Sequence, residues 1–206
     1  MADPRPGRPS LRPRAAAGDA ATGSEAALDV ARRALGPLRE VTALDRGRAL
    51  VAVAADVEDR RAQFVDEVRR AGGGRFSEAV GVVDGLVDDT VRWAGWADKL
   101  DLLAPGWPGS TRPPGVVAVR PAGGSLRDLA GAVAAVLLTG GTVLLADGTR
   151  PAGLLVAAVL ARFPAGCVQV VPEDADLPVR TTFAAPATDG ERVLDLLDPV
   201  SLTFAR

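Results

Sequence analysis

Residues 120–131, RPAGGSLRDLAG, combine glycines, a serine and an aspartate at a point where chemistry could occur. They lie between an apolar run typical of a strand and one typical of a helix, where nucleotide-binding folds often hold phosphate. The stretch lacks the Gly-Lys-Ser/Thr ending of a Walker A loop, and its glycines do not match the dinucleotide fingerprint G-x-G-x-x-G. It does fit a capping box, in which Ser125 and Asp128 exchange hydrogen bonds across the first helical turn. We predict a helix start whose capacity for an anion is reduced by the Asp128 carboxylate.

The second residue with catalytic potential is Cys167, the only cysteine among 206 residues. A serine or cysteine triad needs an imidazole base, and the chain has no histidine. Cys167 begins the apolar run CVQVV, where a thiol is usually an unreactive part of the core. A single cysteine excludes an intrachain disulfide, and without histidine a structural zinc site is not expected. The sequence therefore predicts neither nucleophilic catalysis nor a metal site within this chain.

The charge balance restricts the classes of partner. The chain has 24 basic and 26 acidic residues, a net charge of −2, whereas nucleic acids and anionic membranes favour a basic surface. No apolar run reaches the roughly 20 residues that a membrane span needs. We expect a cytoplasmic protein with neither a nucleic-acid nor a membrane partner.

The chain divides into three parts by composition and periodicity. Residues 1–22 contain four prolines and four arginines and are expected to form a disordered tail. Residues 23–112 have a helical pattern, with one helix from Ser24 to Pro37 and another from Asp45 to the Gly72–Gly74 break. Residues 113–206 have the shorter period of strands alternating with helices.

A third helix in the 23–112 segment has the clearest apolar stripe. Its members recur at spacings of three and four residues and so share one helical face. They are Ala79, Val83, Leu86, Thr90, Trp93, Ala97 and Leu100. We expect this stripe to pack within the chain, with a subunit interface as the alternative, and Trp93 and Trp96 to pack rather than stack on a ligand.

The segment 113–206 predicts a β-α-β-α-β-α-β order. Four short apolar runs are typical of strands, and three longer patterns between them are typical of helices. The predicted strands are 115–119, 142–146, 167–171 and 201–205, and the predicted helices are 125–138, 151–163 and 189–197. The fold class is therefore α/β, with an N-terminal helical segment followed by a partial Rossmann-like parallel sheet whose ligands lie at the carboxyl ends of the strands.

The run VRWAGWADKL at 91–100 resembles a helix segment of the aldehyde dehydrogenase superfamily. PPGVVAVRP, LLTGGTVLL and the run ending in CVQVVPED resemble the family's next strands in the same order. LLDPVSLTFAR resembles the approach to its Phe-Thr-Gly-Ser turn. The resemblance covers roughly 24–206, the first part of a full-length member, and implies an aldehyde-dehydrogenase-like fold.

Several positions depart from the family's pattern. Where the family has Pro-Trp-Asn, whose asparagine holds the oxyanion, this chain has Pro121-Ala122-Gly123. Loss of one oxyanion donor typically costs ~10² to 10³ in rate. Where the family has a ribose-binding Lys-Pro-Ser/Ala-Glu, this chain has Ala146-Asp147-Gly148-Thr149. The resemblance leaves Pro121, Gly123, Gly124, Ser125 and Asp147 as vestigial cofactor-binding candidates, with Asp147 able to accept from ribose hydroxyls.

The resemblance also implies that the phosphate-binding helix and the catalytic domain would follow Arg206. We therefore expect a degenerate, truncated member without independent activity and with no or weak NAD(P) binding. It would act as a binding or regulatory partner, as a homo-oligomer or with a full-length homologue. One alternative is one part of a split NAD(P)-dependent aldehyde dehydrogenase, and another is a remnant without function. Self-association is expected because a terminal strand at 201–205 would leave an unpaired sheet edge.

Overall fold

The computed structural model describes residues 17–100, 114–121 and 125–184. A helical part comes first, as predicted, and strands then alternate with helices as far as β3, after which β4 follows without a helix between them. The elements are α1 (Ala17–Glu40), α2 (Ala43–Asp59), α3 (Arg61–Gly72), α4 (Phe76–Ala94), β1 (Val116–Pro121), α6 (Leu126–Leu138), β2 (Thr142–Leu145), α7 (Arg150–Leu160), β3 (Val168–Val170) and β4 (Arg180–Ala184).

The four strands form one parallel sheet in the order β3-β2-β1-β4. In its register Val117 lies beside Val143, and Val119 lies beside Thr182 on the other side. Every residue of β2 is buried, because helices cover both faces of the central strands. The predicted α/β class with a partial Rossmann-like parallel sheet is therefore confirmed.

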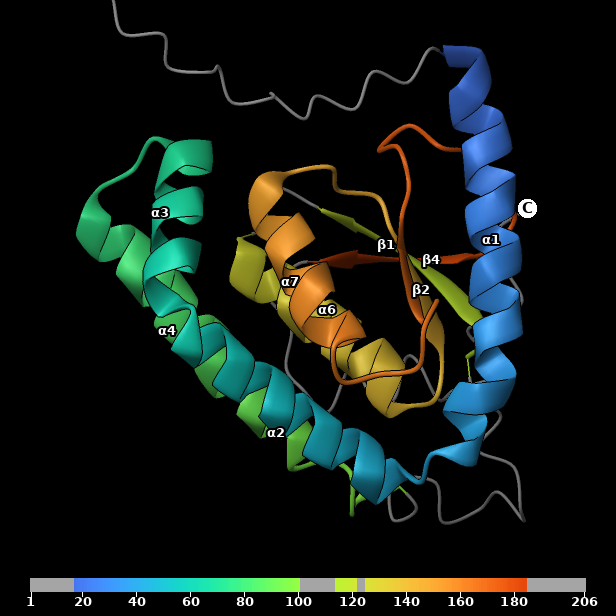
Figure 1. The fold of residues 1–206 in the computed structure, drawn as a ribbon, viewed down its shortest axis with the longest axis horizontal. Coiled ribbons are helices and arrows are strands. Elements are labelled where there is room, and N and C mark those ends of the chain that lie inside the picture. The colour runs from blue at the N-terminus through green and yellow to red at the C-terminus, as the bar shows by residue number, and fades with distance from the viewer. Residues whose placement is uncertain (1–16, 101–113, 122–124, 185–206) are drawn as a thin grey trace, which may run out of the picture.

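The elements lie in layers (Figure 1). Helix α1 covers one face of the sheet, where Leu28 and Ala31 pack against Ala118 and Leu144. Helices α6 and α7 cover the other face, and α2, α3 and α4 pack outside them. The larger core therefore lies between the sheet and the α2–α4 helices, with α6 at its centre, where residues 129–138 are all buried.

The apolar stripe packs within the chain, as predicted, but it does not lie on a single helix. Helix α4 ends at Ala94, so Ala97 and Leu100 lie beyond it. All seven stripe residues are buried, and Trp93 is 2% exposed. Gly47 of α2 allows close approach at this contact, since a Cβ there would lie 2.7 Å from the Cβ of Ala97 and 3.0 Å from the carbonyl oxygen of Ala94.

Two helix boundaries predicted from the sequence are wrong. Helix α1 does not end at Pro37 but continues to Glu40. The residue before the proline is Gly36, which lacks the Cβ that would collide with the proline ring, and Leu38 is fully buried in the last turn. The helix predicted from Asp45 to the glycine break is two helices, because the chain bends at Arg60 (φ −105°, ψ 19°). The bend lets α3 pack against α4 and α7.

Other boundaries differ by less. Helix α1 begins at Ala17, ahead of the predicted boundary at residue 23, while residues 1–16 of the predicted tail lie outside the described residues. Strand β4 at 180–184 was not predicted. The predicted helix at 189–197 and strand at 201–205 lie outside the described residues.

Candidate functional site

A cavity of about 330 Å³ lies where β1 and β2 end and α6 and α7 begin. This is the edge of a parallel α/β sheet at which ligands generally bind. Three polar residues line it, namely Ser125, Asp147 and Thr149. Its apolar wall comes from α3, α4, α6 and α7, through Val68, Ala71, Val82, Leu126, Leu129 and Pro151.

The start of α6 is the capping box predicted from the sequence. Asp128 N–H donates to Ser125 Oγ at 3.4 Å, and Asp128 Oδ2 accepts from the Ser125 N–H at 2.8 Å and from its hydroxyl at 3.0 Å. The Asp128 carboxylate thus occupies part of the positive helix end that would otherwise attract a phosphate.

The start of α7 also has an aspartate beside it, Asp147. Asp147 Oδ1 accepts from the Thr149 N–H at 2.8 Å, and Thr149 Oγ1 accepts from the Ala152 N–H at 3.4 Å. Asp147 is 9% exposed. Both crossover helices therefore begin at a hydroxyl N-cap with an aspartate close by, which places one carboxylate at each helix start.

Two arginines in the first turns of these helices reach buried acids on the α3–α4 layer. Arg127 donates twice to Asp89 of α4, and this hydrogen bonding raises the pKa of the Arg127 guanidinium. Arg150 lies 3.7 Å from Glu67 of α3. Arg127 thus joins α6 to α4, whereas the Arg150 side chain is 85% exposed and makes only this long contact.

Cys167 lies away from this cavity. It precedes β3, so it is at the amino end of the sheet, opposite the edge where β1 and β2 end. It is fully buried, and burial raises the pKa of its thiol to about 12. A thiol in this state is protonated at neutral pH and is a poor nucleophile.

The structure brings together two of the five vestigial candidates in one cavity, Ser125 and Asp147. Pro121 ends β1 at the same edge of the sheet, next to Ala184 of β4. Gly123 and Gly124 lie outside the described residues. Thr149 was missed, although a threonine two residues before Pro151 is a recognisable helix start.

The described residues contain neither a metal-ligand cluster nor a membrane-spanning helix. No group of three or more acidic, cysteine or histidine residues within 17–100, 114–121 and 125–184 could hold a metal ion. No helix in those ranges has both the length and the apolar character needed to cross a bilayer.

The fold and the position of the cavity define a Rossmann-like module, and sequence comparison assigns it to a family. The profile of the aldehyde dehydrogenase family matches residues 11–188, so the chain belongs to the aldehyde dehydrogenase family. No curated protein matches the sequence.

Solved structures share the fold. Proline utilization A from Bdellovibrio bacteriovorus has a TM-score of 0.65 and 23% identity over 74% of this chain and 17% of that chain. Proline utilization A from Bradyrhizobium japonicum has a TM-score of 0.61 and 26% identity over 73% of this chain and 17% of that chain. A betaine aldehyde dehydrogenase from Staphylococcus aureus, solved with NAD⁺, has a TM-score of 0.61 and 22% identity over 74% of this chain and 34% of that chain. The chain therefore spans about a third or less of the length of these relatives.

Proposed function

We propose that this chain is a non-catalytic member of the aldehyde dehydrogenase family that acts as a binding or regulatory partner, either of a second copy or of a full-length homologue. The observation that carries the proposal is the placement of Asp128 and Asp147 at the starts of α6 and α7. Both carboxylates accept backbone N–H groups at the edge of the sheet where a dinucleotide would bind.

The starts of α6 and α7 do not fit a phosphate group. A phosphate at the start of α6 or α7 would compete with a carboxylate for the helix end and would be repelled by its charge. Of the two arginines in these first turns, Arg127 is held by Asp89, whereas Arg150 is 85% exposed and lies 3.7 Å from Glu67. We therefore propose that the chain binds NAD(P) weakly or not at all, and we derive no reaction step through that cofactor.

The lack of catalysis is supported by the chemistry of the nucleophile. Thiol attack on an aldehyde needs a thiolate with access to substrate. Cys167 is buried with a raised pKa, at the opposite end of the sheet from the cavity. The chain has no histidine to activate it.

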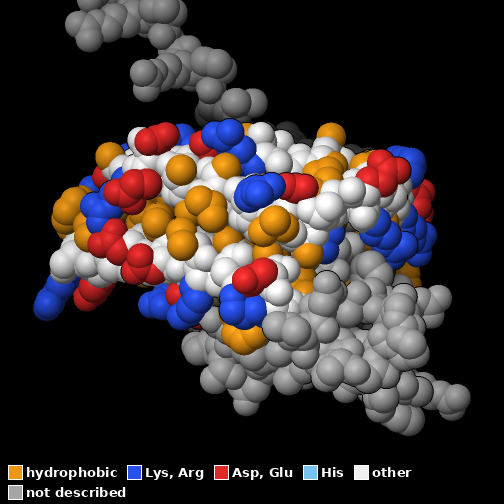
Figure 2. All heavy atoms as spheres, turned by 90° about the horizontal axis from the view of Figure 1, so that it is seen from below, with side chains coloured by type: hydrophobic (Ala, Val, Ile, Leu, Met, Phe, Trp, Pro, Cys, Tyr) orange, Lys and Arg blue, Asp and Glu red, His pale blue; other side chains and the backbone are white. Residues whose placement is uncertain are grey.

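The surface offers apolar side chains to a protein partner. Leu44 and Val51 are seven residues apart on α2 and are 51% and 48% exposed, and Val91 of α4 is 47% exposed. In Figure 2 apolar groups lie among acidic and basic side chains, and no basic patch dominates that face. These features support a protein partner over a nucleic acid. We also propose that the chain works in the cytoplasm, because its only cysteine is a buried free thiol.

The alternative is one part of a split NAD(P)-dependent aldehyde dehydrogenase. Two observations favour it: the parallel sheet is retained, and the chain covers only 17–34% of the length of the relatives. In a split enzyme the catalytic residues would lie on another chain.

Calorimetry with NAD⁺ and NADP⁺ separates the two functions. The proposal predicts dissociation constants weaker than about 1 mM, whereas a low-micromolar constant would contradict it and support the split enzyme. The variant Asp128→Asn/Asp147→Asn is expected to bind ADP several-fold more tightly than the natural chain, and Glu40→Gln on the exposed surface of α1 is the matched control. Equal ADP affinity in all three proteins would remove the charge argument.

Two assays test the remaining parts of the proposal. NADH formation with short aliphatic aldehydes should be absent, and Cys167→Ala should leave any activity or binding that the chain shows unchanged. Light scattering should show self-association or a complex with a co-encoded aldehyde dehydrogenase. A strictly monomeric chain that ignores this enzyme at tens of micromolar would contradict the partner role.

A further inference from the structure

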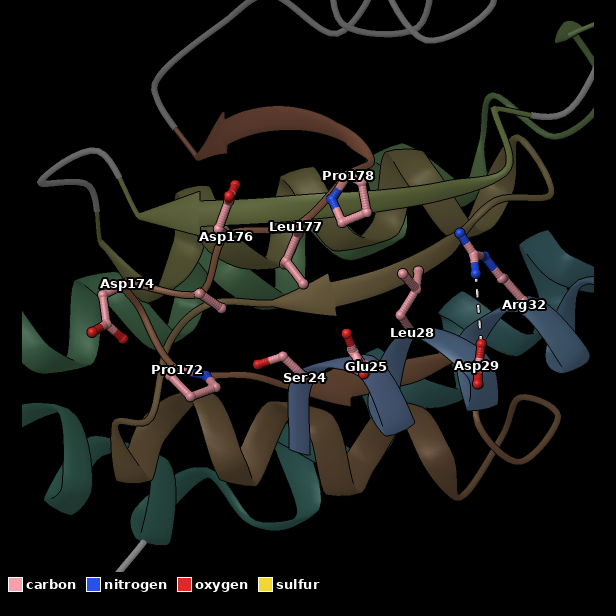
Figure 3. A pocket seen from close by; sticks show the side chains of 11 residues that line it. Ser24, Glu25, Leu28, Asp29, Arg32, Pro172, Asp174, Asp176, Leu177 and Pro178 are labelled. Carbon is pink, nitrogen blue, oxygen red and sulfur yellow. Dashed lines mark ion pairs between the residues drawn. The ribbon is translucent and has the colours of Figure 1, made fainter. Parts of the chain in front are cut away.

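A second hollow, of about 520 Å³, lies on the opposite side of the sheet from the cavity described above. It runs between α1 and residues 172–178, the segment that follows β3, and we call it the α1 groove (Figure 3). Leu28 and Leu177 lie on its two sides, and in Figure 3 the Leu177 side chain extends toward α1. The groove thus has an apolar centre.

The rim of the α1 groove is acidic. Arg32 is the one basic residue among its described lining, and its guanidinium lies 3.5 Å from the Asp29 carboxylate. The acidic lining residues are Glu25, Asp29, Asp174 and Asp176. Four carboxylates against one guanidinium attract a basic ligand, most strongly at low salt.

The loop side of the groove is held in place by the sheet. Arg120 of β1 donates through Nη1 to the carbonyl of Glu173 and through Nη2 to the carbonyl of Ala175. The Ala175 N–H donates to the carbonyl of Pro172 at 3.1 Å. These bonds fix residues 172–178 beside α1, so the groove is formed before any ligand arrives.

The segment that precedes α1 has the complementary chemistry. Residues 4–14, PRPGRPSLRPR, contain four arginines and no acidic residue. Leu11 is the one large apolar side chain in this segment, and Arg8 and Arg12 flank it. Four prolines favour an extended, polyproline-like backbone, which loses little conformational freedom when it binds.

The geometry allows the segment to reach the groove of its own chain. Helix α1 begins at Ala17, and the groove begins at Ser24, about 10 Å further along the helix at ~1.5 Å per residue. Residues 4–14 can extend over roughly 35 Å, so they can turn back along α1. The short connection also gives the segment a millimolar effective concentration at the groove, as is typical of short linkers.

We propose that the α1 groove is the docking site of the chain's own arginine- and proline-rich N-terminal segment. Leu11 packs on Leu177, and the flanking arginines pair with the carboxylates of the rim. This interaction is independent of the proposed non-catalytic role, since it involves the other face of the sheet.

Paramagnetic relaxation in the full chain tests the proposal. A nitroxide is attached to Ser10→Cys, while the natural Cys167 stays unlabelled because it is buried. The expected result is broadening of backbone amide signals in 24–32 and 172–178 at low salt, with loss of the broadening at about 0.5 M salt, where the Debye length falls to a few ångströms. Unbroadened groove signals at low salt would overturn the proposal.

Matched variants identify the contacts. Asp174→Asn/Asp176→Asn should lower the docked population by roughly threefold per carboxylate, as exposed ion pairs permit, and Leu11→Ser should abolish docking. Asp88→Asn, an exposed acid on α4, should leave the broadening unchanged. Equal broadening in all variants would overturn the proposed contacts.

A mixing experiment identifies the source of the segment. Spin-labelled chain without ¹⁵N is added to unlabelled ¹⁵N chain. The absence of broadening in the ¹⁵N chain supports docking within one chain. Broadening there would show that a second copy supplies the segment, which contradicts the proposal.

Discussion

Arg127 in the first turn of α6 and Asp89 of α4 form a two-point ion pair. The Arg127 Nη2 atom lies 3.0 Å from Asp89 Oδ1, and Nε donates to Oδ2. Gly85, one turn before Asp89, provides space for the guanidinium, since a Cβ there would lie 2.8 Å from Arg127 Cδ. The pair joins the α4 layer to the helix that starts at the candidate site.

Removal of Asp89 should destabilise the fold. Its side chain is 10% exposed and also forms an ion pair with Arg92, whose Nη2 lies 2.7 Å from Asp89 Oδ1. Its removal therefore leaves two guanidinium groups without this partner. Asp89→Ala is expected to lower the free energy of unfolding by about 1–3 kcal/mol. Urea denaturation measures this, with the exposed Glu40→Ala at the end of α1 as the control, for which a change within about 0.5 kcal/mol is expected. Similar losses in the two variants would show that the ion pair contributes nothing.

Two helical glycines should respond oppositely to alanine. At Gly47 a Cβ would meet the Ala97 Cβ at 2.7 Å and the Ala94 carbonyl at 3.0 Å, and backbone cannot move aside cheaply. Gly47→Ala should therefore cost about 1–3 kcal/mol. At Gly81 of α4 nothing lies within 4 Å, so Gly81→Ala should stabilise the protein by about 0.5–1 kcal/mol. Chemical denaturation of both variants checks the signs, and a stabilising Gly47→Ala would refute the close packing of α2 on α4.

The features that the sequence predicted correctly depend on short-range spacing. The capping box needs only Ser125 and a residue three positions later, and the stripe that includes Trp93 needs only the helical period. The strands that meet at the candidate site are continuous apolar runs, so Ser125 and Asp147 could be expected at the same edge of the sheet.

The features that sequence reasoning missed depend on distant partners. The bend at Arg60 contains neither glycine nor proline, and it serves the packing of α3 against α4 and α7. Strand β4 exists because β1 offers it a free edge, with Val119 beside Thr182. Val68 of α3 and Val82 of α4 line the cavity. No local sequence pattern predicts that these two residues lie near the end of β1.

The hydrogen bond from the Asp128 N–H to Ser125 Oγ at the start of α6 should stabilise the fold. Ser125→Ala removes the acceptor of the Asp128 N–H and is expected to cost about 1 kcal/mol. Ser125→Asn keeps a side-chain acceptor and should restore most of the loss. Thermal and urea unfolding of the two variants measure the difference. Equal stability of the alanine and asparagine variants would mean that the hydroxyl bond does not stabilise the helix.

The buried Cys167 thiol should make the protein sensitive to alkali. Burial raises its pKa from 9.0 to about 12, so the folded chain keeps a proton that the unfolded chain loses once the pH passes 9. The free energy of unfolding should then be constant below about pH 8 and fall by about 1–2 kcal/mol by pH 10.5. Few other groups ionise in this range, because the chain has no tyrosine and Lys99 is its one lysine. Cys167→Ala should be less stable at pH 7, because it leaves a small cavity, but its stability should change much less between pH 8 and 10.5. Urea titrations at several pH values compare the two proteins, and parallel declines would show that another group causes the alkaline loss.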